Sequence, residues 1–164
     1  MKQIVCVDSQ WGIGKNGRLL CHLSGDLKYF KEKTLGNLCL MGQTTLQSLP
    51  GAKPLPERET WVLTDDLYFQ AGCPKVHTLE ALVMAAQARE RKGDVTVYVC
   101  GGAATYHALL PYCDECLVTK MEQSFDADRF YDNLDQDPAW ERTEEGPLQT
   151  EGPVSYRFCV YRRK

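Results

Sequence analysis

The sequence contains no apolar run that approaches the roughly 20 residues a membrane-spanning helix requires. Its start lacks the apolar segment of a secretory signal peptide. It also lacks a stripe of Lys and Arg, since the net charge is −3 and the sequence pI is about 5.6. Without such a stripe, a nucleic-acid partner is disfavoured. These absences predict a soluble, cytoplasmic protein that binds neither membranes nor nucleic acid.

No internal repeat, low-complexity stretch or linker divides the chain. At 164 residues it is long enough to build one domain with a real core, burying about 70% of its unfolded surface. We therefore expect a single domain over residues 1–164.

The eight cysteines include only one C-x-x-C, Cys113 to Cys116, and no second pair stands at zinc-ribbon spacing. Four others lie in apolar, strand-like runs, where a free thiol behaves as a small buried hydrophobe. They are Cys6, Cys39, Cys100 and Cys159. We interpret the cysteines as reduced structural thiols and assign no metal site, with a metal or redox role of the C-x-x-C as the alternative.

Strand-like and helix-like segments alternate along the chain. Predicted strands cover residues 2–8, 38–41, 60–64, 75–77, 95–99, 115–120, 140–145 and 154–162. Predicted helices cover residues 25–34, 43–49, 79–91 and 103–110, with a glycine-rich loop at 9–24 and turns at 50–58. This order predicts an α/β fold with a central, mostly parallel eight-stranded sheet, an antiparallel C-terminal strand and about four flanking helices.

One carboxylate stands at the start of the first predicted helix. Leu27, Phe30 and Thr34 recur at the spacing of a buried helical face, and Asp26 lies four residues before Phe30 on that face. Asp26 is therefore either a helix cap or a functional group. Ser24 is a suitable cap, which favours the functional interpretation.

Three segments could bind anions. Residues 12–17 match G-x-G-x-x-G, but no helix follows at once, so a mobile loop covering a site is favoured over a dinucleotide fingerprint. Residues 38–45 and 97–106 each read as strand, glycine turn and helix start, which suits a pyrophosphate, although ordinary capped turns would look similar. Residues 53–58 end in Arg58, whose fork suits a carboxylate if it is more than a surface charge.

The assembled motifs resemble dihydrofolate reductase of the bacterial type, in an order and spacing that cover almost the whole chain. The matching segments are residues 13–17, 26–31, 41–42, 48–50, 54–56, 62–64, 101–103, 109–111 and 125–128, with Thr45, Arg58, Tyr106, Thr119, Tyr156 and Phe158. The resemblance implies reduction of 7,8-dihydrofolate to tetrahydrofolate with a hydride from NADPH. It further implies a cytoplasmic monomer that binds antifolates.

The resemblance also implies roles for individual residues. Asp26 would be the catalytic acid, binding the pterin with help from Thr119 and from the carbonyls of Ile4 and Cys100. The implied substrate-binding residues are Ile4, Cys6, Leu27, Phe30, Lys31, Leu49, Lys53, Leu55, Arg58, Cys100, Tyr106 and Thr119. The implied cofactor-binding residues are Cys6, Ile13, Gly14, Gly17, Leu19, Gly42, Gln43, Thr44, Thr45, Leu63, Thr64, Asp65, Gly101, Gly102, Ala103, Ala104 and Thr105. Residues 9–23 would form the lid.

The chain departs from the family pattern in two places. Cys21 stands where a tryptophan is usual. Gln43 replaces the usual arginine, and Asp65 with Asp66 follows Thr64. The second change should weaken binding of the cofactor's 2′-phosphate, unless Lys75 or His77 compensates, and so reduce discrimination against NADH.

Two alternatives to a dihydrofolate reductase remain. One is a catalytically weak folate- or nucleotide-binding homologue, and Cys21 and Gln43 motivate it. The other is a pyrimidine reductase of riboflavin synthesis, which Asp26 together with Arg58 disfavours.

Overall fold

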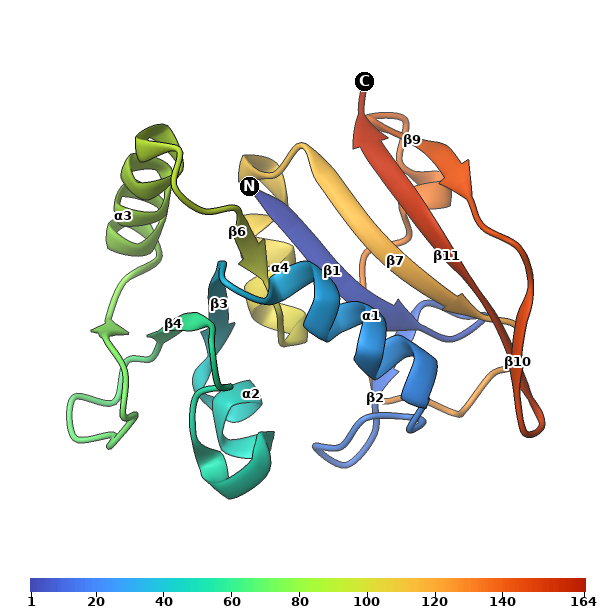
Figure 1. Ribbon diagram of the computed structural model, residues 1–164, viewed down its shortest axis with the longest axis horizontal. Coiled ribbons are helices and arrows are strands. Elements are labelled where there is room, and N and C mark those ends of the chain that lie inside the picture. Colours follow the sequence, from blue (N-terminus) through green and yellow to red (C-terminus); the bar gives the residue numbers. More distant parts are fainter.

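The computed structural model describes residues 1–164 and contains a nine-stranded sheet in the order β10-β11-β7-β1-β6-β3-β4-β5, with β9 paired to β11 (Figure 1). Its strands are β1 (Lys2–Val7), β3 (Leu38–Gly42), β4 (Glu59–Leu63), β5 (Lys75–Val76), β6 (Val97–Val99), β7 (Glu115–Met121), β9 (Trp140–Glu145), β10 (Gln149–Glu151) and β11 (Val154–Arg163). Strands β5, β4, β3, β6, β1 and β7 pair in parallel. Strand β11 pairs antiparallel with β7, β9 and β10. The structure thus confirms the predicted fold class, and β10 is an additional short strand.

Four helices cover the two faces of the sheet, as predicted: α1 (Ser24–Thr34), α2 (Gln43–Ser48), α3 (Leu79–Lys92) and α4 (Ala103–Leu109). Alternation along β3 separates the faces. Leu38 and Leu40 join the main core with residues of α3 and α4. Cys39 and Met41 point to the opposite face and pack with Leu46 of α2. Figure 1 shows α1 crossing in front of β1 while α4 lies behind it.

The start of α1 differs from the sequence prediction. Ser24 is the first helical residue rather than the cap, and Leu23 occupies the cap position without a side-chain bond. The carboxylate of Glu151, in β10, instead accepts hydrogen bonds from the amides of Ser24 (2.7 Å) and Gly25 (3.1 Å). A carboxylate at a helix N-terminus satisfies free amides and complements the helix dipole. The cap therefore comes from the far end of the chain, where local sequence reasoning does not look.

The glycine-rich segment 9–24 is only partly a free loop, which corrects its prediction as a uniform one. Gly12–Gly14 forms strand β2, paired with β8 (Arg129–Phe130). Trp11 is 6% exposed and stacks on Tyr131, with ring centroids 6.2 Å apart. Residues 15–19, by contrast, are all exposed. Only the middle of the segment is therefore placed to act as a lid.

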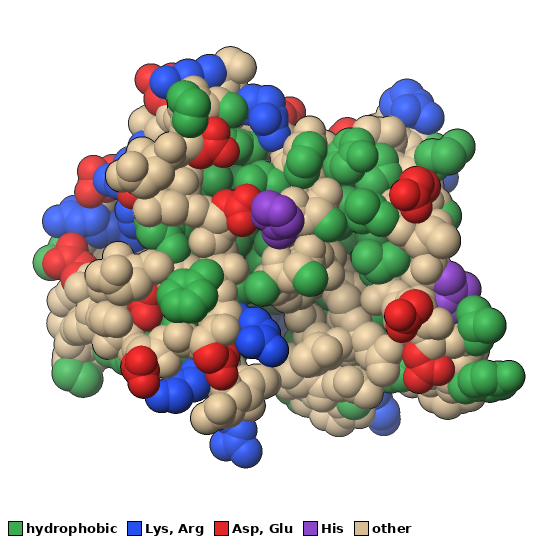
Figure 2. Space-filling view, turned by 180° about the vertical axis from the view of Figure 1, so that it is seen from behind, with side chains coloured by type: hydrophobic (Ala, Val, Ile, Leu, Met, Phe, Trp, Pro, Cys, Tyr) green, Lys and Arg blue, Asp and Glu red, His purple; other side chains and the backbone are tan.

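The surface carries both signs of charge, and the cysteines are unpaired. Figure 2 shows Asp and Glu side chains interspersed with Lys and Arg on the side opposite to Figure 1. All eight cysteines are free thiols, four of them fully buried. No helix has the length and apolar character that would let it span a membrane.

Candidate active site

Asp26 lies in the first turn of α1, next to the carboxyl ends of β1 and β7. The Thr119 hydroxyl donates a 2.6 Å hydrogen bond to its Oδ1. The register of the two strands places Cys6 opposite Thr119, so both side chains approach the same carboxylate. Burial raises the pKa of Asp26, and the Thr119 hydroxyl and Cys6 thiol oppose that rise by stabilising the ionised form. Asp26 is thus a partly desolvated acid held in one orientation.

The Cys6 thiol is part of this arrangement. Burial, and then the nearby Asp26 carboxylate, hold the pKa of Cys6 well above its ordinary value. The thiol therefore stays protonated beside Asp26, because a thiolate there would be poorly solvated and close to a negative charge. It can act as a weak donor but not as a nucleophile at neutral pH.

Apolar side chains form two walls on the face of the sheet that α1 and α2 cover. Phe30 of α1 packs on a cluster that includes Ile4 and Leu117. Leu49, after α2, packs on the cluster of Cys39 and Met41. Cys100 touches both clusters, so it lies between the two walls. Leu55 is half-buried, whereas Leu27 is 41% exposed.

Arg58 is a half-buried cation without an acidic partner. Its Nε donates to the carbonyl of Pro56 at 3.0 Å, and its Nη1 lies 3.4 Å from the Thr34 hydroxyl. No ion pair in the protein involves this guanidinium. Its remaining N–H groups suit a carboxylate. Lys31 and Lys53 are exposed and likewise form no ion pair.

Tyr106 joins the two sides of the site. Its hydroxyl donates a 2.6 Å hydrogen bond to the carbonyl of Ile4, which leaves that carbonyl one further lone pair. The carbonyl of Tyr106 accepts from Gln3, and Gln3 in turn accepts from the Tyr131 hydroxyl at 2.6 Å. Sequence reasoning missed Gln3 and Tyr131. The one sequence feature that could have indicated this buried network is the polar residue Gln3 within an otherwise apolar strand.

The two predicted glycine turns meet. The Gly42 amide donates to the carbonyl of Gly101 at 2.9 Å. A Cβ on Gly42 would lie 2.9 Å from the Thr105 hydroxyl, and a Cβ on Gly101 would lie 3.1 Å from the Thr45 hydroxyl. Neither α2 nor α4 has a side-chain cap. Small residues, hydroxyls and unbonded amides thus line one surface, a donor set that fits a pyrophosphate.

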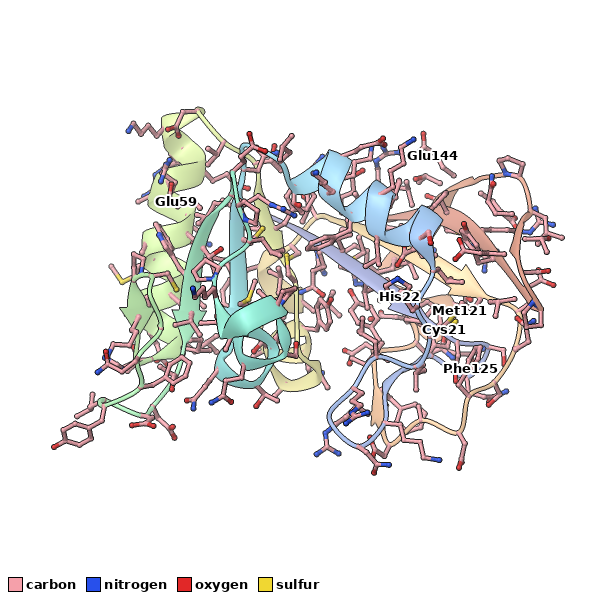
Figure 3. The ribbon with its side chains drawn as sticks, turned by 60° about the horizontal axis from the view of Figure 1, so that its bottom comes forward. Cys21, His22, Glu59, Met121, Phe125 and Glu144 are labelled. Carbon is pink, nitrogen blue, oxygen red and sulfur yellow. The ribbon has the colours of Figure 1, made fainter.

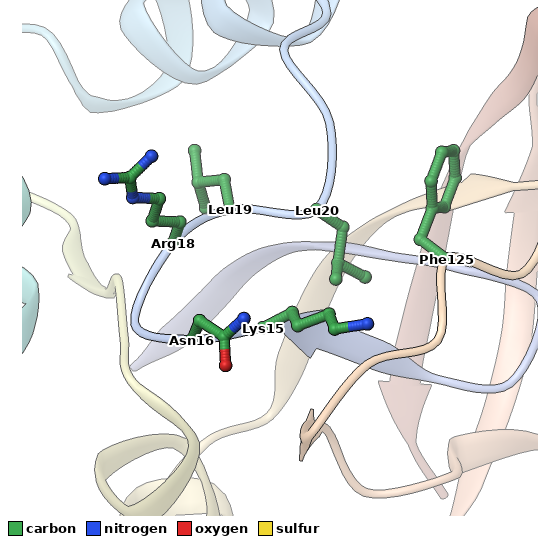
Figure 4. A pocket seen from close by; sticks show the side chains of 6 residues that line it. All are labelled: Lys15, Asn16, Arg18, Leu19, Leu20 and Phe125. Atoms are coloured by element: carbon green, nitrogen blue, oxygen red, sulfur yellow. The ribbon is translucent and has the colours of Figure 1, made fainter.

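The lid borders a cavity of about 520 Å³, lined by Lys15, Asn16, Arg18, Leu19, Leu20 and Phe125 (Figure 4). Lys15 pairs with Asp126 at 2.9 Å, and the amide of Asn16 donates to Asp128 at 2.9 Å. Buried Asp8 accepts from the amides of Gly12 (2.8 Å) and Phe125 (2.9 Å). The lid is therefore attached to the loop after β7. Sequence reasoning placed five of these six residues in the lid, assigned Leu19 alone among them to the cofactor, and did not assign Phe125.

Cys21 lies where the lid enters α1. It packs against a cluster of Leu23, Met121, Val154 and Tyr156, which Cys6 also contacts. Figure 3 shows Cys21 near Met121 at this end of the sheet. The position that departs from the family pattern is therefore next to the Asp26 region, and it presents a thiol there instead of an indole N–H.

A second cavity lies beside the glycine turns. It measures about 570 Å³ and is lined by Gln43, Thr44, Leu63, Thr64, Asp65, His77 and Leu79. Five of these residues are among those that the sequence assigned to the cofactor. His77 was named only as a possible compensating cation, and Leu79 was not assigned. Both follow a two-residue strand, β5, which pairs with β4.

Comparison with known proteins gives one consistent result. The model of the family described as "Dihydrofolate reductase" matches residues 1–163. The dihydrofolate reductase of Bacillus subtilis (strain 168) is 34% identical over 165 residues, which are 98% of this chain and 93% of the relative. That of Staphylococcus haemolyticus is 31% identical, covering 98% and 93%. The structure of dihydrofolate reductase from Enterococcus faecalis, complexed with NADP(H) and RAB-propyl, matches with a TM-score of 0.83 and 32% identity over 99% of this chain and 95% of that chain.

Proposed function

This chain belongs to the dihydrofolate reductase family, and we propose that it reduces 7,8-dihydrofolate to 5,6,7,8-tetrahydrofolate with NADPH, using Asp26 as its acid. The observation that carries the proposal is the Asp26–Thr119 pair at 2.6 Å, in which burial raises the pKa of the carboxyl group. A pterin presents two adjacent N–H donors on its amino-pyrimidine edge, and a carboxylate presents two acceptors. Asp26 therefore binds that edge as a carboxylate and supports protonation at N5 of the pterin.

The remaining substrate contacts follow from the geometry. The carbonyls of Ile4 and Cys100 complete the polar lining around the pterin, where they can accept from a ring N–H, because the single amino group of the dihydropterin donates to Asp26. Phe30 and Leu49 pack on the aminobenzoyl ring from opposite walls. Arg58, which has no acidic partner of its own, pairs with the substrate's glutamate carboxylate. The same residues bind antifolates that carry an amino-pyrimidine ring.

Residues of the two glycine turns would hold the cofactor, with Tyr106 and Cys6 lining the place of its nicotinamide. When bound, NADPH supplies the hydride. Gly42, Thr45, Gly101 and Thr105 hold the pyrophosphate through amides and hydroxyls. Residues 15–19 close over the reacting atoms and exclude water, which strengthens the electrostatic interactions inside the site.

Two alternatives are separable from this function. A pyrimidine reductase would need a partner for a ribityl phosphate, and the combination of Asp26 with an unpaired Arg58 disfavours it. A binding protein without turnover would bind the same ligands but not oxidise NADPH. The test is therefore the decrease in NADPH absorbance in the presence of dihydrofolate, measured with the purified chain.

The variant Asp26→Asn gives the decisive comparison. General acid catalysis contributes a rate factor of about 10² to 10⁴, so kcat should decrease by a factor in that range. Folding should be retained, because Asn keeps an acceptor for Thr119 and removes a charge that burial disfavours. Asp114→Asn is the matched control, since Asp114 is exposed at the opposite end of β7. Unchanged turnover in Asp26→Asn would refute the assigned role.

A further inference from the structure

The cavity beside the glycine turns has a charge pattern that does not suit a phosphate. None of its seven lining residues is Lys or Arg, and its one carboxylate belongs to Asp65. His77 is the only lining residue that can carry a positive charge. Its Nδ1 lies 2.7 Å from the carbonyl of Thr64, which can only accept, so Nδ1 carries the proton of this bond.

Hydrogen bonds around Thr64 fix the floor of this cavity. The buried Thr64 hydroxyl bonds to the Gln43 side chain and accepts from the amide of Asp66 at 3.1 Å. Gln43 is therefore held at the end of β4 as a neutral amide. An amide in this position offers no charge to a dianionic group.

The two neighbouring carboxylates differ in availability. Asp66 turns back to accept the amide of Tyr68 at 2.9 Å. Asp65 is exposed, lines the cavity and forms neither a hydrogen bond nor an ion pair through its side chain. Lys75, the nearest lysine along the chain, donates to the carbonyls of Leu67 (3.2 Å) and Phe69 (2.8 Å) and does not line the cavity. Asp65 thus has no cation to neutralise it.

We propose that this cavity binds the adenosine ribose with Asp65 accepting hydrogen bonds from its 2′- and 3′-hydroxyls, so that NADH binds with an affinity close to that of NADPH. In dinucleotide-binding proteins a carboxylate on the ribose hydroxyls accompanies NAD, and an arginine accompanies the 2′-phosphate of NADP. This chain has the carboxylate and lacks the arginine. The inference rests on the proposed function, because it needs the dinucleotide to lie along the glycine turns.

The first test measures binding without turnover. Titration calorimetry with NADP⁺ and with NAD⁺, at one fixed ionic strength, gives two dissociation constants. A charge-assisted hydrogen bond to a phosphate is worth about 10- to 100-fold in affinity. Without a Lys or Arg partner, NADP⁺ should bind less than about 10-fold more tightly than NAD⁺, which is below the gain from one such bond. A larger ratio would overturn the inference.

Variants then identify the residue responsible. Asp65→Ser should weaken the binding of NAD⁺ and strengthen that of NADP⁺, so that the ratio of the two dissociation constants changes by about 10-fold or more. Gln43→Arg should strengthen the binding of NADP⁺ by a similar factor and leave the affinity for NAD⁺ nearly unchanged. Asp66→Ser is the control, because its carboxylate is used within its own turn, and it should change the ratio by less than about 3-fold. An equal effect of Asp65→Ser and Asp66→Ser would show a general charge effect and overturn the assignment to Asp65.

The reductase assay with both reduced cofactors separates the two proposals. If neither supports reduction of dihydrofolate, the proposed function fails while the binding ratio still decides the inference. If NADPH alone supports it and NAD⁺ does not bind, the inference fails and the function stands. If neither dinucleotide binds, both fail.

Discussion

The hydrogen bond from Thr119 to Asp26 can be removed by a substitution that hardly changes the shape of the side chain. Thr119→Val replaces the hydroxyl by a methyl group at a position that is 1% exposed. A hydrogen bond to a charged group contributes about 1.5–3 kcal/mol. For a chain of this size that corresponds to a fall in Tm of about 3–12 °C at neutral pH. Thr60→Val is the matched control, because the buried Thr60 hydroxyl has no hydrogen-bond partner, and its loss should be neutral or stabilising.

The pH dependence tests the reasoning more sharply than the size of the effect. The pKa of Asp26 is raised in the folded protein, so the folded state holds the proton more tightly than the unfolded chain. The contribution of this group to stability is therefore greatest at low pH and falls as pH rises from the ordinary aspartate range, about 3.9, through the raised value. Removing the Thr119 donor raises the pKa of Asp26 further. The difference in Tm between Thr119→Val and the parent should therefore be small at pH 4 and largest at pH 8.

Two measurements check this prediction. Thermal unfolding followed by circular dichroism between pH 4 and pH 8 gives the stability difference. The pH profile of kcat/KM for dihydrofolate gives the ionisation that matters for activity, and its acid–base transition should move to higher pH in Thr119→Val. If that transition stays in place and Thr119→Val behaves like Thr60→Val, Thr119 does not stabilise the ionised carboxylate and the derived role of Asp26 is wrong.

Two further substitutions test the binding slot and the packing of α1. Arg58→Leu removes the charge-assisted pairing with the substrate carboxylate, so the KM for dihydrofolate should rise about 10- to 100-fold while the KM for NADPH stays unchanged. Steady-state kinetics measure both constants, and Arg91→Leu, at a solvent-exposed position in α3, is the control. If the two variants behaved alike, the assigned role of Arg58 would be contradicted. Gly25→Ala should destabilise the fold by about 1–3 kcal/mol, because the added Cβ would overlap the Tyr156 hydroxyl. The clash involves the hydroxyl oxygen only, since the ring atom that carries it, Cζ, would lie at an ordinary contact distance of 3.5 Å. Adding Tyr156→Phe should restore most of the lost Tm, and no recovery would mean that the strain lies elsewhere.

Local sequence patterns predicted the regular elements well, because strands and helices have different periodicities that the chain displays directly. All eight predicted strands and four helices are present. The patterns were weakest in residues 9–24 and 146–151. There, β2 and β10 are three residues each, and their pairing partners β8 and β11 contribute more to their formation than their own composition does.

The sequence by itself determined the family and the α/β alternation, and it named Asp26 as the candidate acid. Asp26, Arg58 and the two glycine turns were named from residue type and spacing, and Thr119 was named from the family resemblance. These assignments are predictions, and each rests on local chemistry: a carboxylate on an apolar helical face, an arginine after a rigid segment, and glycines between a strand and a helix.

Only the tertiary structure decided how these residues cooperate. It assigned the cap of α1 to Glu151 rather than Ser24, placed Thr119 within 2.6 Å of Asp26 and left Arg58 without an acidic partner. It also directed Lys75 to backbone carbonyls, which leaves Asp65, the one carboxylate lining the second cavity, without a lysine partner. The physical reason is the same in each case. Hydrogen-bond partners and the local dielectric depend on which distant segments the sheet brings together, and no local pattern encodes that distance.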